Sequence, residues 1–405
     1  MKENVVSVET ARDILLSRVK QMGTEKVSLE KASGRVIAQD IIAAENVPPF
    51  DRSPYDGYAF RAEDVQTASK ENPVTLKILE EIPAGGVPHC TVTEGTAVKI
   101  LTGAPVPPGA DAVQMFEKTE FTAETVTLFK PLRSGDNVIY AGEDVKKGAE
   151  LAKSGTVIDA GLMGTLAGQC IANPEVYRRP MVGIISTGTE VRELDEELEA
   201  GKIYNSNRYT FTQVLGHCGC DSVYLGRVKD SADEISALIN KGLASCDAII
   251  LTGGVSVGDY DLTPEAMEKS GCEMLFLGVE MKPGMGCAYG VKDGVLVCGL
   301  SGNPASALTN FYAVALPAIR KLTGLSEYIP DEITVTLKNG FKKKSPSARY
   351  LRGKLDLSSG KVLMELPSDQ GNVVLSSVIG CNVIALVPAG SGPLEAGTEL
   401  KGFIV

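Results

Sequence analysis

The stretch CDAIILTGGVSVGDYDLT, residues 246–263, decides the fold class of this chain. Its apolar run at 248–251 is too short for a helix, so it predicts a buried strand of a parallel sheet. Gly253 and Gly254 then end the strand in a loop that lets a ligand approach the backbone. In open α/β sheets, ligands bind at the carboxyl ends of the strands, where this loop would lie. Asp261 is the second of two carboxylates that follow it.

A second strand and loop, VGIISTGTE at residues 182–190, repeats this order of apolar run, glycine and acid. Two such loops favour a metal-assisted phosphate site, and ordinary turns between strands and helices are the alternative. Mg²⁺ prefers carboxylate oxygens and shares its ligand shell with substrate phosphates. No cysteine lies in an obvious electropositive loop, which favours a mechanism without a covalent cysteine intermediate. The loop acids are Asp56, Glu190, Asp230, Asp259 and Asp261.

Strands alternate with helices between residues 178 and 326, which predicts a doubly wound, mostly parallel α/β domain. One of its helices is expected at 305–322. Asn303 is expected to cap this helix and Pro304 to occupy its first position, where free N–H groups favour a phosphate or oxyanion. Lys282, before a Pro-Gly turn, would either reach a phosphate or lie in solvent as an ordinary turn lysine.

The remaining sequence has the alternating pattern of short strands, apart from two predicted helices, one at 7–22 with Ser7 as its N-cap and one at 159–171. The predicted fold class is therefore α/β plus all-β modules. The predicted domains are an N-terminal linker domain at 1–45 and 145–177, an inserted β-rich lobe at 46–144, the α/β domain at 178–326, and a small barrel-like β domain at 327–405.

Composition excludes several functional classes. The net charge of −11 over 405 residues argues against general nucleic-acid binding. No apolar run approaches the ~18 residues that a membrane span needs, and the N-terminus has no apolar signal core. The nine cysteines are scattered without a C-x-x-C pair, so we expect a cytoplasmic protein. The cluster at 217–220, His-Cys-Gly-Cys, could suggest zinc, but core packing is the favoured interpretation.

Motifs spread over nearly the whole chain resemble the molybdopterin molybdenumtransferase family, the bacterial MoeA proteins, which is similar to the E domain of gephyrin. The resemblance implies Mg²⁺-dependent conversion of adenylylated molybdopterin and molybdate into molybdenum cofactor and AMP. It also implies a four-domain homodimer, in which the N-terminal domain serves dimerisation, and a transient contact with the molybdopterin adenylyltransferase. The matching motifs are SPYDGYAFRAED (53–64), ILTGAPVPPGADAV (100–113), GEDVKKG (142–148), ISTGTE (185–190), IYNSNRYT (203–210), LTGGVSVGDYD (251–261), KPG (282–284) and GNPASA (302–307).

The same resemblance assigns roles to individual residues by motif. The implied catalytic residues are Asp56, Thr102, Glu190, Asp230 and Asp261, of which Glu190, Asp230 and Asp261 would bind the metal. The implied substrate-binding residues are Gly253, Gly254, Ser256, Lys282, Asn303, Pro304 and Arg349.

The chain departs from the family pattern at three places near the expected oxyanion. Met285 replaces a lysine that is usually followed by proline, Ser301 replaces a proline, and Asn372 stands where a serine is expected. Losing that lysine removes one positive charge, so a divergent paralogue that handles tungstate or another oxyanion is one alternative. A non-catalytic scaffold is a second, although the retained acids argue against it. The adenylyltransferase is a third, but it resembles only residues 178–326.

Overall fold

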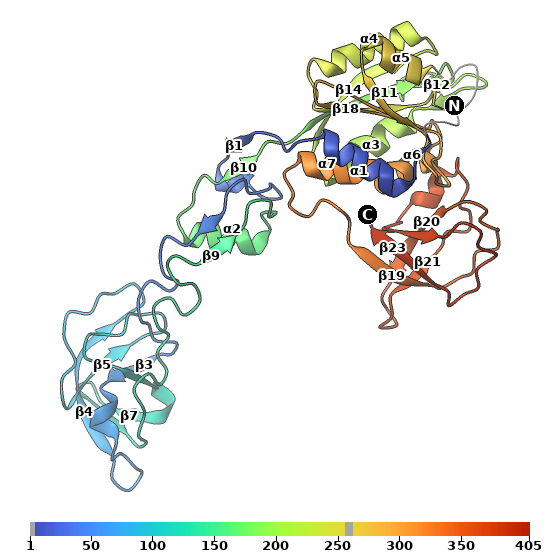
Figure 1. The fold of residues 1–405 in the computed structure, drawn as a ribbon. Helices are drawn as coiled ribbons and strands as arrows, with labels where there is room; N and C mark the ends of the chain where they lie inside the picture. Colours follow the sequence, from blue (N-terminus) through green and yellow to red (C-terminus); the bar gives the residue numbers. More distant parts are fainter. Residues whose placement is uncertain (1–4, 256–261) are drawn as a thin grey trace. The chain divides into compact units, whose positions relative to one another are not determined.

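The computed structural model describes residues 5–255 and 262–405 (Figure 1). The chain forms two compact units. Unit 1 comprises Met1–Gln39, Ser154–Asp159 and Asn173–Val405, and unit 2 comprises Asp40–Lys153 and Ala160–Ala172. This division is coarser than the four predicted domains, whose boundaries stay a prediction.

A six-stranded sheet forms the centre of unit 1, in the order β14-β11-β15-β18-β17-β16. The first four strands are parallel and the last two are antiparallel. The run predicted from residues 248–251 is β15, between β11 and β18, and all five of its residues are buried. The strands are β11 (Met181–Thr187), β14 (Asp221–Val228), β15 (Ala248–Thr252), β16 (Glu273–Leu277), β17 (Ala288–Lys292) and β18 (Val295–Leu300).

Helices cover both faces of this sheet (Figure 1). Ile184 and Ile250 pack on one side with α1, α3, α6 and α7, whereas Ile185 and Ile249 pack on the other with α4 and α5. Successive side chains of a strand point to opposite faces of the sheet, so adjacent residues pack against different helices. The helices are α1 (Val8–Arg18), α3 (Ser206–His217), α4 (Ala232–Leu243), α5 (Thr263–Lys269), α6 (Pro304–Asn310) and α7 (Leu316–Leu322). As predicted, Ser7 caps α1 through its hydroxyl oxygen.

The helix expected at 305–322 is interrupted. Its middle, Phe311–Ala315, is a π-helix between α6 and α7. Pro317 has no N–H, so it cannot bond to the carbonyl four residues earlier, at Ala313. Arg12 Nε donates to that carbonyl instead, at 2.5 Å. The proline therefore explains why one continuous α-helix is not formed.

The C-terminal part of unit 1 is a closed barrel in the order β19-β21-β20-β22-β23, as the barrel-like prediction required. Tyr350 and Ile384 of the barrel belong to the same core as α1, α3 and α7. The barrel strands are β19 (Glu332–Leu337), β20 (Arg349–Asp356), β21 (Leu363–Glu365), β22 (Val383–Val387) and β23 (Glu399–Ile404), and η5 (Leu375–Val378) is a short 3₁₀-helix. Unit 1 also contains η1 (Leu29–Lys31) and two small strand pairs, β1 (Thr24–Lys26) with β10 (Glu175–Tyr177) and β12 (Val191–Arg192) with β13 (Ile203–Tyr204).

Unit 2 contains a mixed six-stranded sheet in the order β6-β3-β5-β4-β8-β7. Its strands are β3 (Gly57–Phe60), β4 (Val74–Ile82), β5 (Thr96–Ile100), β6 (Ala112–Met115), β7 (Thr119–Phe121) and β8 (Thr125–Leu128). The remaining elements are β2 (Ile41–Ile42) paired with β9 (Glu150–Ala152), the helix α2 (Ala160–Gly168), and the 3₁₀-helices η2 (Ala62–Val65) and η3 (Phe116–Lys118).

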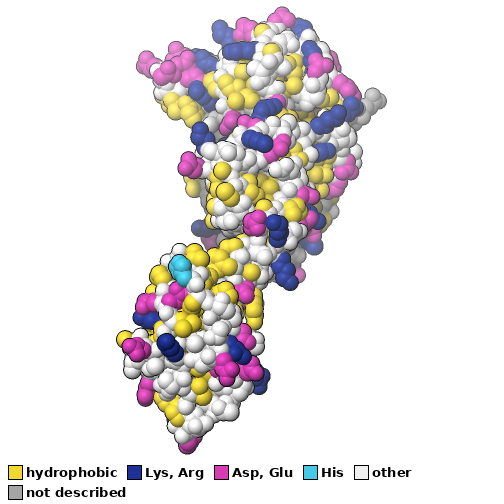
Figure 2. Space-filling view, turned by 90° about the vertical axis from the view of Figure 1, so that its left-hand side faces the viewer, with side chains coloured by type: hydrophobic (Ala, Val, Ile, Leu, Met, Phe, Trp, Pro, Cys, Tyr) yellow, Lys and Arg dark blue, Asp and Glu magenta, His cyan; other side chains and the backbone are white. Residues whose placement is uncertain are grey.

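The distribution of surface charge agrees with the argument against general nucleic-acid binding. On the face shown in Figure 2, Lys and Arg side chains are interspersed with Asp and Glu rather than gathered into one basic patch. Within the described ranges, none of the helices has the length and hydropathy that crossing a bilayer requires.

Candidate functional site

A cavity of about 1350 Å³ lies in unit 1, and we call it the sheet-end pocket. Loops that follow β11, β14, β15 and β18 line it, as does the first turn of α3. Ser347, Asn372, Val373 and Leu375 of the C-terminal domain complete the lining. The pocket therefore lies where parallel strands end, which is the usual ligand position in open α/β sheets.

The Thr-Gly-Gly loop after β15 needs its glycines. Gly253 has φ +108°, and a Cβ there would lie 2.4 Å from Thr187 Oγ1. Gly254 has φ +64°, which also favours glycine. Thr263 Oγ1 donates to the Gly253 carbonyl at 2.9 Å, which ties the loop to the start of α5. The backbone therefore approaches β11 closely, and the pocket wall is fixed at this point.

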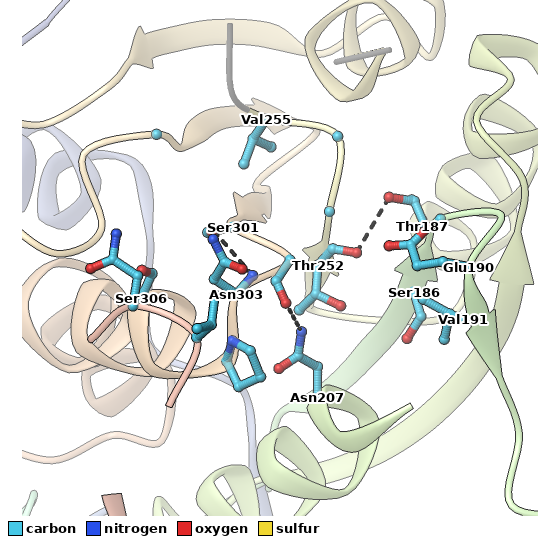
Figure 3. A pocket seen from close by; sticks show the side chains of 18 of the residues that line it. Ser186, Thr187, Glu190, Val191, Asn207, Thr252, Val255, Ser301, Asn303 and Ser306 are labelled. Atoms are coloured by element: carbon cyan, nitrogen blue, oxygen red, sulfur yellow. Dashed lines mark hydrogen bonds between the residues drawn. The ribbon is translucent and has the colours of Figure 1, made fainter. Parts of the chain in front are cut away.

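Two of the predicted acids, Glu190 and Asp230, line this pocket. Asp230 Oδ2 accepts the Thr189 hydroxyl at 2.7 Å and the Thr189 backbone N–H at 3.3 Å. Within the described part of the chain, the Glu190 carboxylate has no hydrogen bond or ion pair, and it is exposed. Glu190 and Thr187 lie on one side of the pocket, and Ser301, Asn303 and Ser306 lie on the other (Figure 3).

These two acids are chemically suited to Mg²⁺, because ionised carboxylates with free oxygens are its usual protein ligands. Residues 5–255 and 262–405 contain no group of three potential metal ligands. The third predicted ligand, Asp261, lies outside the described residues, as does Ser256. The fit therefore rests on Glu190 and Asp230, with Lys229, Lys282 and Glu234 as the other charged side chains in the lining.

Lys282 lines the pocket on a loop that the barrel supports. Its backbone N–H donates to Ala348 O at 3.0 Å, and its carbonyl accepts from Tyr350 N–H at 2.8 Å. Two residues later, the Gly284 carbonyl accepts from Asn310 Nδ2 at 2.7 Å, and Asn310 Oδ1 accepts from Tyr289 Oη at 2.6 Å. Buried side chains thus hold a loop whose lysine ammonium is exposed.

Asn303 and Pro304 also line the pocket, but one detail of the prediction is wrong. Asn303 is the N-cap residue of α6, yet its side chain makes no capping hydrogen bond. The Asn303 backbone N–H instead donates to Ser301 Oγ at 3.2 Å. The hydroxyl of Ser301 therefore stabilises this turn. From the sequence, Ser301 was noted only as a departure from the family pattern.

Two arginines of β20 differ in position. Arg349, the predicted ligand, donates to Ser345 Oγ at 3.3 Å, lies 5.3 Å from the Phe341 ring centroid and does not line the pocket. Arg352 instead donates to Gly371 O and Thr309 Oγ1, both at 3.3 Å, and its Nε is buried without a partner among the described atoms. Burial lowers the pKa of both guanidinium groups. Arg352 therefore holds the strand-to-loop segment beside Asn372, and sequence reasoning missed it.

Asp56 and Thr102 belong to unit 2, whereas the sheet-end pocket is lined by residues of unit 1. Asp56 Oδ1 accepts both the Thr102 N–H and the Thr102 hydroxyl, each at 2.7 Å. The backbone bond first, and then the hydroxyl bond, lowers the pKa of the Asp56 carboxyl. The structure thus brings these two predicted residues together as an ionised, hydrogen-bonded pair.

The three departures from the family pattern, Met285, Ser301 and Asn372, all line the sheet-end pocket. Met285 is more than half exposed. The fold and the pocket therefore define a class of protein: a doubly wound α/β sheet whose carboxyl edge carries glycine-rich loops, carboxylates and lysines around a ligand-sized cavity.

Comparisons with known proteins narrow this class. Residues 6–169 match a model described as the MoeA N-terminal region, domains I and II. Residues 183–321 match a "probable molybdopterin binding domain", and residues 334–401 match the MoeA C-terminal region, domain IV.

Named relatives match this chain over nearly its full length. The chain is 35% identical to a molybdopterin molybdenumtransferase of Staphylococcus aureus, over 98% of this chain and 94% of the relative. It is 37% identical to that of Bacillus subtilis, over 95% and 91%. The crystal structure of a MoeA protein from Pyrococcus horikosii superposes with TM-score 0.85 at 32% identity, over 99% of both chains. This chain therefore belongs to the MoeA family of molybdopterin molybdenumtransferases, a family of transferase enzymes.

Proposed function

We propose that this protein is a molybdopterin molybdenumtransferase of molybdenum cofactor biosynthesis. In this proposal it inserts molybdate into adenylylated molybdopterin with Mg²⁺ and releases AMP. Full-length relatives that carry this name support the activity. The observation that carries the substrate class is the pocket at the ends of β11, β14, β15 and β18, whose size suits a pterin that carries a nucleotide.

The charges of the pocket support a divalent cation. Among the described lining residues, three have carboxylates, Glu190, Asp230 and Glu234, and two are lysines, Lys229 and Lys282. A phosphoanhydride would add negative charge to this surface, so its binding needs further positive charge. Glu190 and Asp230, with Asp261, would hold Mg²⁺, which when bound neutralises phosphate charge during cleavage. Lys282, on its braced loop, would orient the anion.

The hydrogen bonds of Asp230 suit this role. Thr189 occupies one carboxylate oxygen, which fixes the rotamer and leaves the other oxygen available. Glu190 keeps both oxygens available within the described chain. The chain's own contribution is therefore to hold two carboxylates in the same pocket as the glycine loop that follows β15.

We also propose a homodimer, as the family resemblance implies. The homodimer is supported by a group of exposed apolar side chains within residues 194–209, because the surfaces of monomeric proteins rarely carry such a group. Light scattering of wild type and of Leu198→Glu measures this: the wild type should be a dimer and the variant a monomer. A wild-type monomer would contradict it. Co-sedimentation with a molybdopterin adenylyltransferase tests the transient contact.

The oxyanion is the point where a second candidate is supported. Met285, Ser301 and Asn372 all line the pocket, so a paralogue that takes tungstate is the alternative. The experiment is to mix the protein with adenylylated molybdopterin, Mg²⁺ and either oxyanion, and to measure AMP. Molybdate-dependent AMP release supports the main proposal. AMP release with tungstate alone supports the alternative. If this protein releases no AMP while a control enzyme does, the non-catalytic scaffold is the remaining interpretation.

A further inference from the structure

A half-buried acid next to the sheet-end pocket has no role in the proposed chemistry. Glu193 follows β12 and does not line the pocket. Its Oε1 accepts from Tyr224 Oη at 2.6 Å and Asn205 Nδ2 at 2.9 Å, and its Oε2 accepts from Arg208 Nη1 at 2.8 Å. Arg208 Cζ also lies 4.0 Å from the centroid of the Tyr224 ring. Three donors from two chain segments, the start of α3 and β14, therefore converge on one carboxylate.

Asn205 connects this cluster to the pocket. Its side chain is buried, at 3% exposure, and it lines the pocket together with Ser186. Asn205 Oδ1 accepts the Arg208 N–H, which caps α3, and the Ser186 hydroxyl, both at 3.2 Å. A carboxylate can only accept, so Glu193 requires the amide nitrogen of Asn205 to face it. The amide oxygen is then directed at Ser186 and the first turn of α3.

Two pocket walls depend on this orientation. Ser186 is on β11, and Asn205, Ser206 and Asn207 begin α3. Asn207 Nδ2 further donates to Gly302 O at 2.9 Å, which joins the same turn to the loop before α6 (Figure 3). An amide that reversed would place its N–H₂ against the Arg208 N–H and lose the cap, because two donors cannot pair.

We propose that Glu193 is a positioning residue: it fixes the amide of Asn205 and, through it, the Ser186 hydroxyl and the first turn of α3 against the bound pterin substrate. This inference rests on the proposed function. Glu193 itself touches no substrate. Burial opposes ionisation of Glu193, but the bonds from Tyr224, Asn205 and Arg208 outweigh it and lower the pKa of its carboxyl.

Glu193→Gln tests the proposal, because glutamine keeps the shape but offers a donor where an acceptor is needed. We expect KM for the pterin substrate to rise about tenfold with kcat within about twofold, since preformed binding geometry is lost and the acids are untouched. Tyr224→Phe removes one donor to Glu193 and the Tyr224 oxygen that accepts from Asn205 Nδ2 at 3.1 Å, but it leaves the bond between Asn205 and Glu193, so it should raise KM less. The matched control is Glu199→Gln. Glu199 is an exposed acid of the same loop, paired with Arg192 at 3.0 Å, and its loss should leave KM unchanged.

A double-mutant cycle separates positioning from general loss of structure. In an Asn205→Ala background, Glu193→Gln should have no further effect on KM, because the connecting amide is gone. Equal tenfold effects in both backgrounds would overturn the proposal. An unchanged KM in Glu193→Gln would overturn it as well.

Hydrogen exchange gives a readout without turnover. The Arg208 amide, which donates to Asn205 Oδ1, should lose protection in Glu193→Gln and keep it in Glu199→Gln. Retained protection in Glu193→Gln contradicts the proposal. If wild type releases no AMP while a control enzyme does, the proposed function fails, and this exchange experiment still decides whether Glu193 positions Asn205.

Discussion

The same carboxylate–threonine pair occurs once in each unit. In unit 2, Asp56 accepts the N–H and hydroxyl of Thr102 on one oxygen, and in unit 1, Asp230 accepts the same two groups of Thr189. The two pairs have different surroundings. Asp230 lies in a pocket beside Glu190, whereas Asp56 lies on an exposed turn of unit 2. The same local arrangement of hydrogen bonds thus occurs in two settings, and the neighbouring residues decide what each acid can do.

The two pairs arise in different ways. In unit 2, β3 and β5 are antiparallel with Gly57 opposite Ile100, so the residue before one strand meets the loop after the other. Gly57 is required there, because a Cβ would lie 2.0 Å from Gln114 O. In unit 1, β11 and β14 are parallel, so their two following loops meet at one edge. Sheet register, rather than proximity in sequence, pairs each acid with its threonine.

The largest expected effect is that of Asp230→Asn. The neutral amide can still accept from Thr189 but contributes no charge to a cation, so AMP release should fall by roughly 100-fold or more. Asp233→Asn is the control, since Asp233 is an exposed acid of α4 paired with Lys269. A rate within threefold of wild type would remove Asp230 from the proposed metal site.

Asp56→Asn is expected to reduce AMP release by about 10- to 100-fold, if the pair in unit 2 serves the same reaction. Circular dichroism should show a retained fold, because asparagine can keep the turn. Asp136→Asn is the matched control. Asp136 is another turn acid of unit 2, and its carboxylate accepts the Arg133 N–H at 2.8 Å. Full activity in Asp56→Asn would reduce the Asp56–Thr102 pair to a structural turn.

Thr102→Val and Thr189→Val sharpen the comparison. Each variant removes one hydroxyl donor but keeps the backbone N–H, so each should lower kcat by about three- to tenfold. Steady-state kinetics of the two variants measure this directly. Similar losses mean that the two pairs act alike, whereas a loss confined to Thr189→Val would mean that only the pair in the pocket matters.

The smallest expected effect is a change in the pKa of the Asp56 carboxyl. Because the folded pKa of Asp56 is lowered, its bonds to Thr102 stabilise the fold above the ordinary carboxyl pKa, about 3.9. That stabilisation is lost as the pH falls through the lowered value. A ¹³C carboxyl titration should place the midpoint below 3.9 in wild type and higher in Thr102→Val. An equal midpoint in both would show that the hydroxyl contributes nothing.

Local patterns predicted the parts of the fold that depend on local physics. The strand at β15, the Ser7 cap of α1 and the alternation of strands and helices were all readable, because periodicity and capping act over a few residues. The break in the helix at 305–322 was not predicted, although Pro317 causes it locally. The donor that replaces the missing N–H, Arg12, is distant in sequence from Ala313 and could not be identified from the local pattern.

The site was readable in part. Glu190, Asp230 and the two glycines follow predicted strands and line the expected edge, as does Lys282, whereas the predicted loop acid Asp56 belongs to unit 2. Arg352, which like Arg349 does not line the pocket, was missed because its partners Thr309 and Gly371 meet it only in the folded chain. Glu193 was missed because its partners Asn205, Arg208 and Tyr224 converge only in the folded chain.

The most direct test of the central claim is the position of the divalent cation. Crystals grown with adenylylated molybdopterin and Mn²⁺ in place of Mg²⁺ would locate the ion by its anomalous scattering. We predict a peak within about 2.5 Å of carboxylate oxygens of Glu190 and Asp230, with the phosphoanhydride beside it. Bound substrate with the peak elsewhere, or with no peak in the sheet-end pocket, would contradict the account.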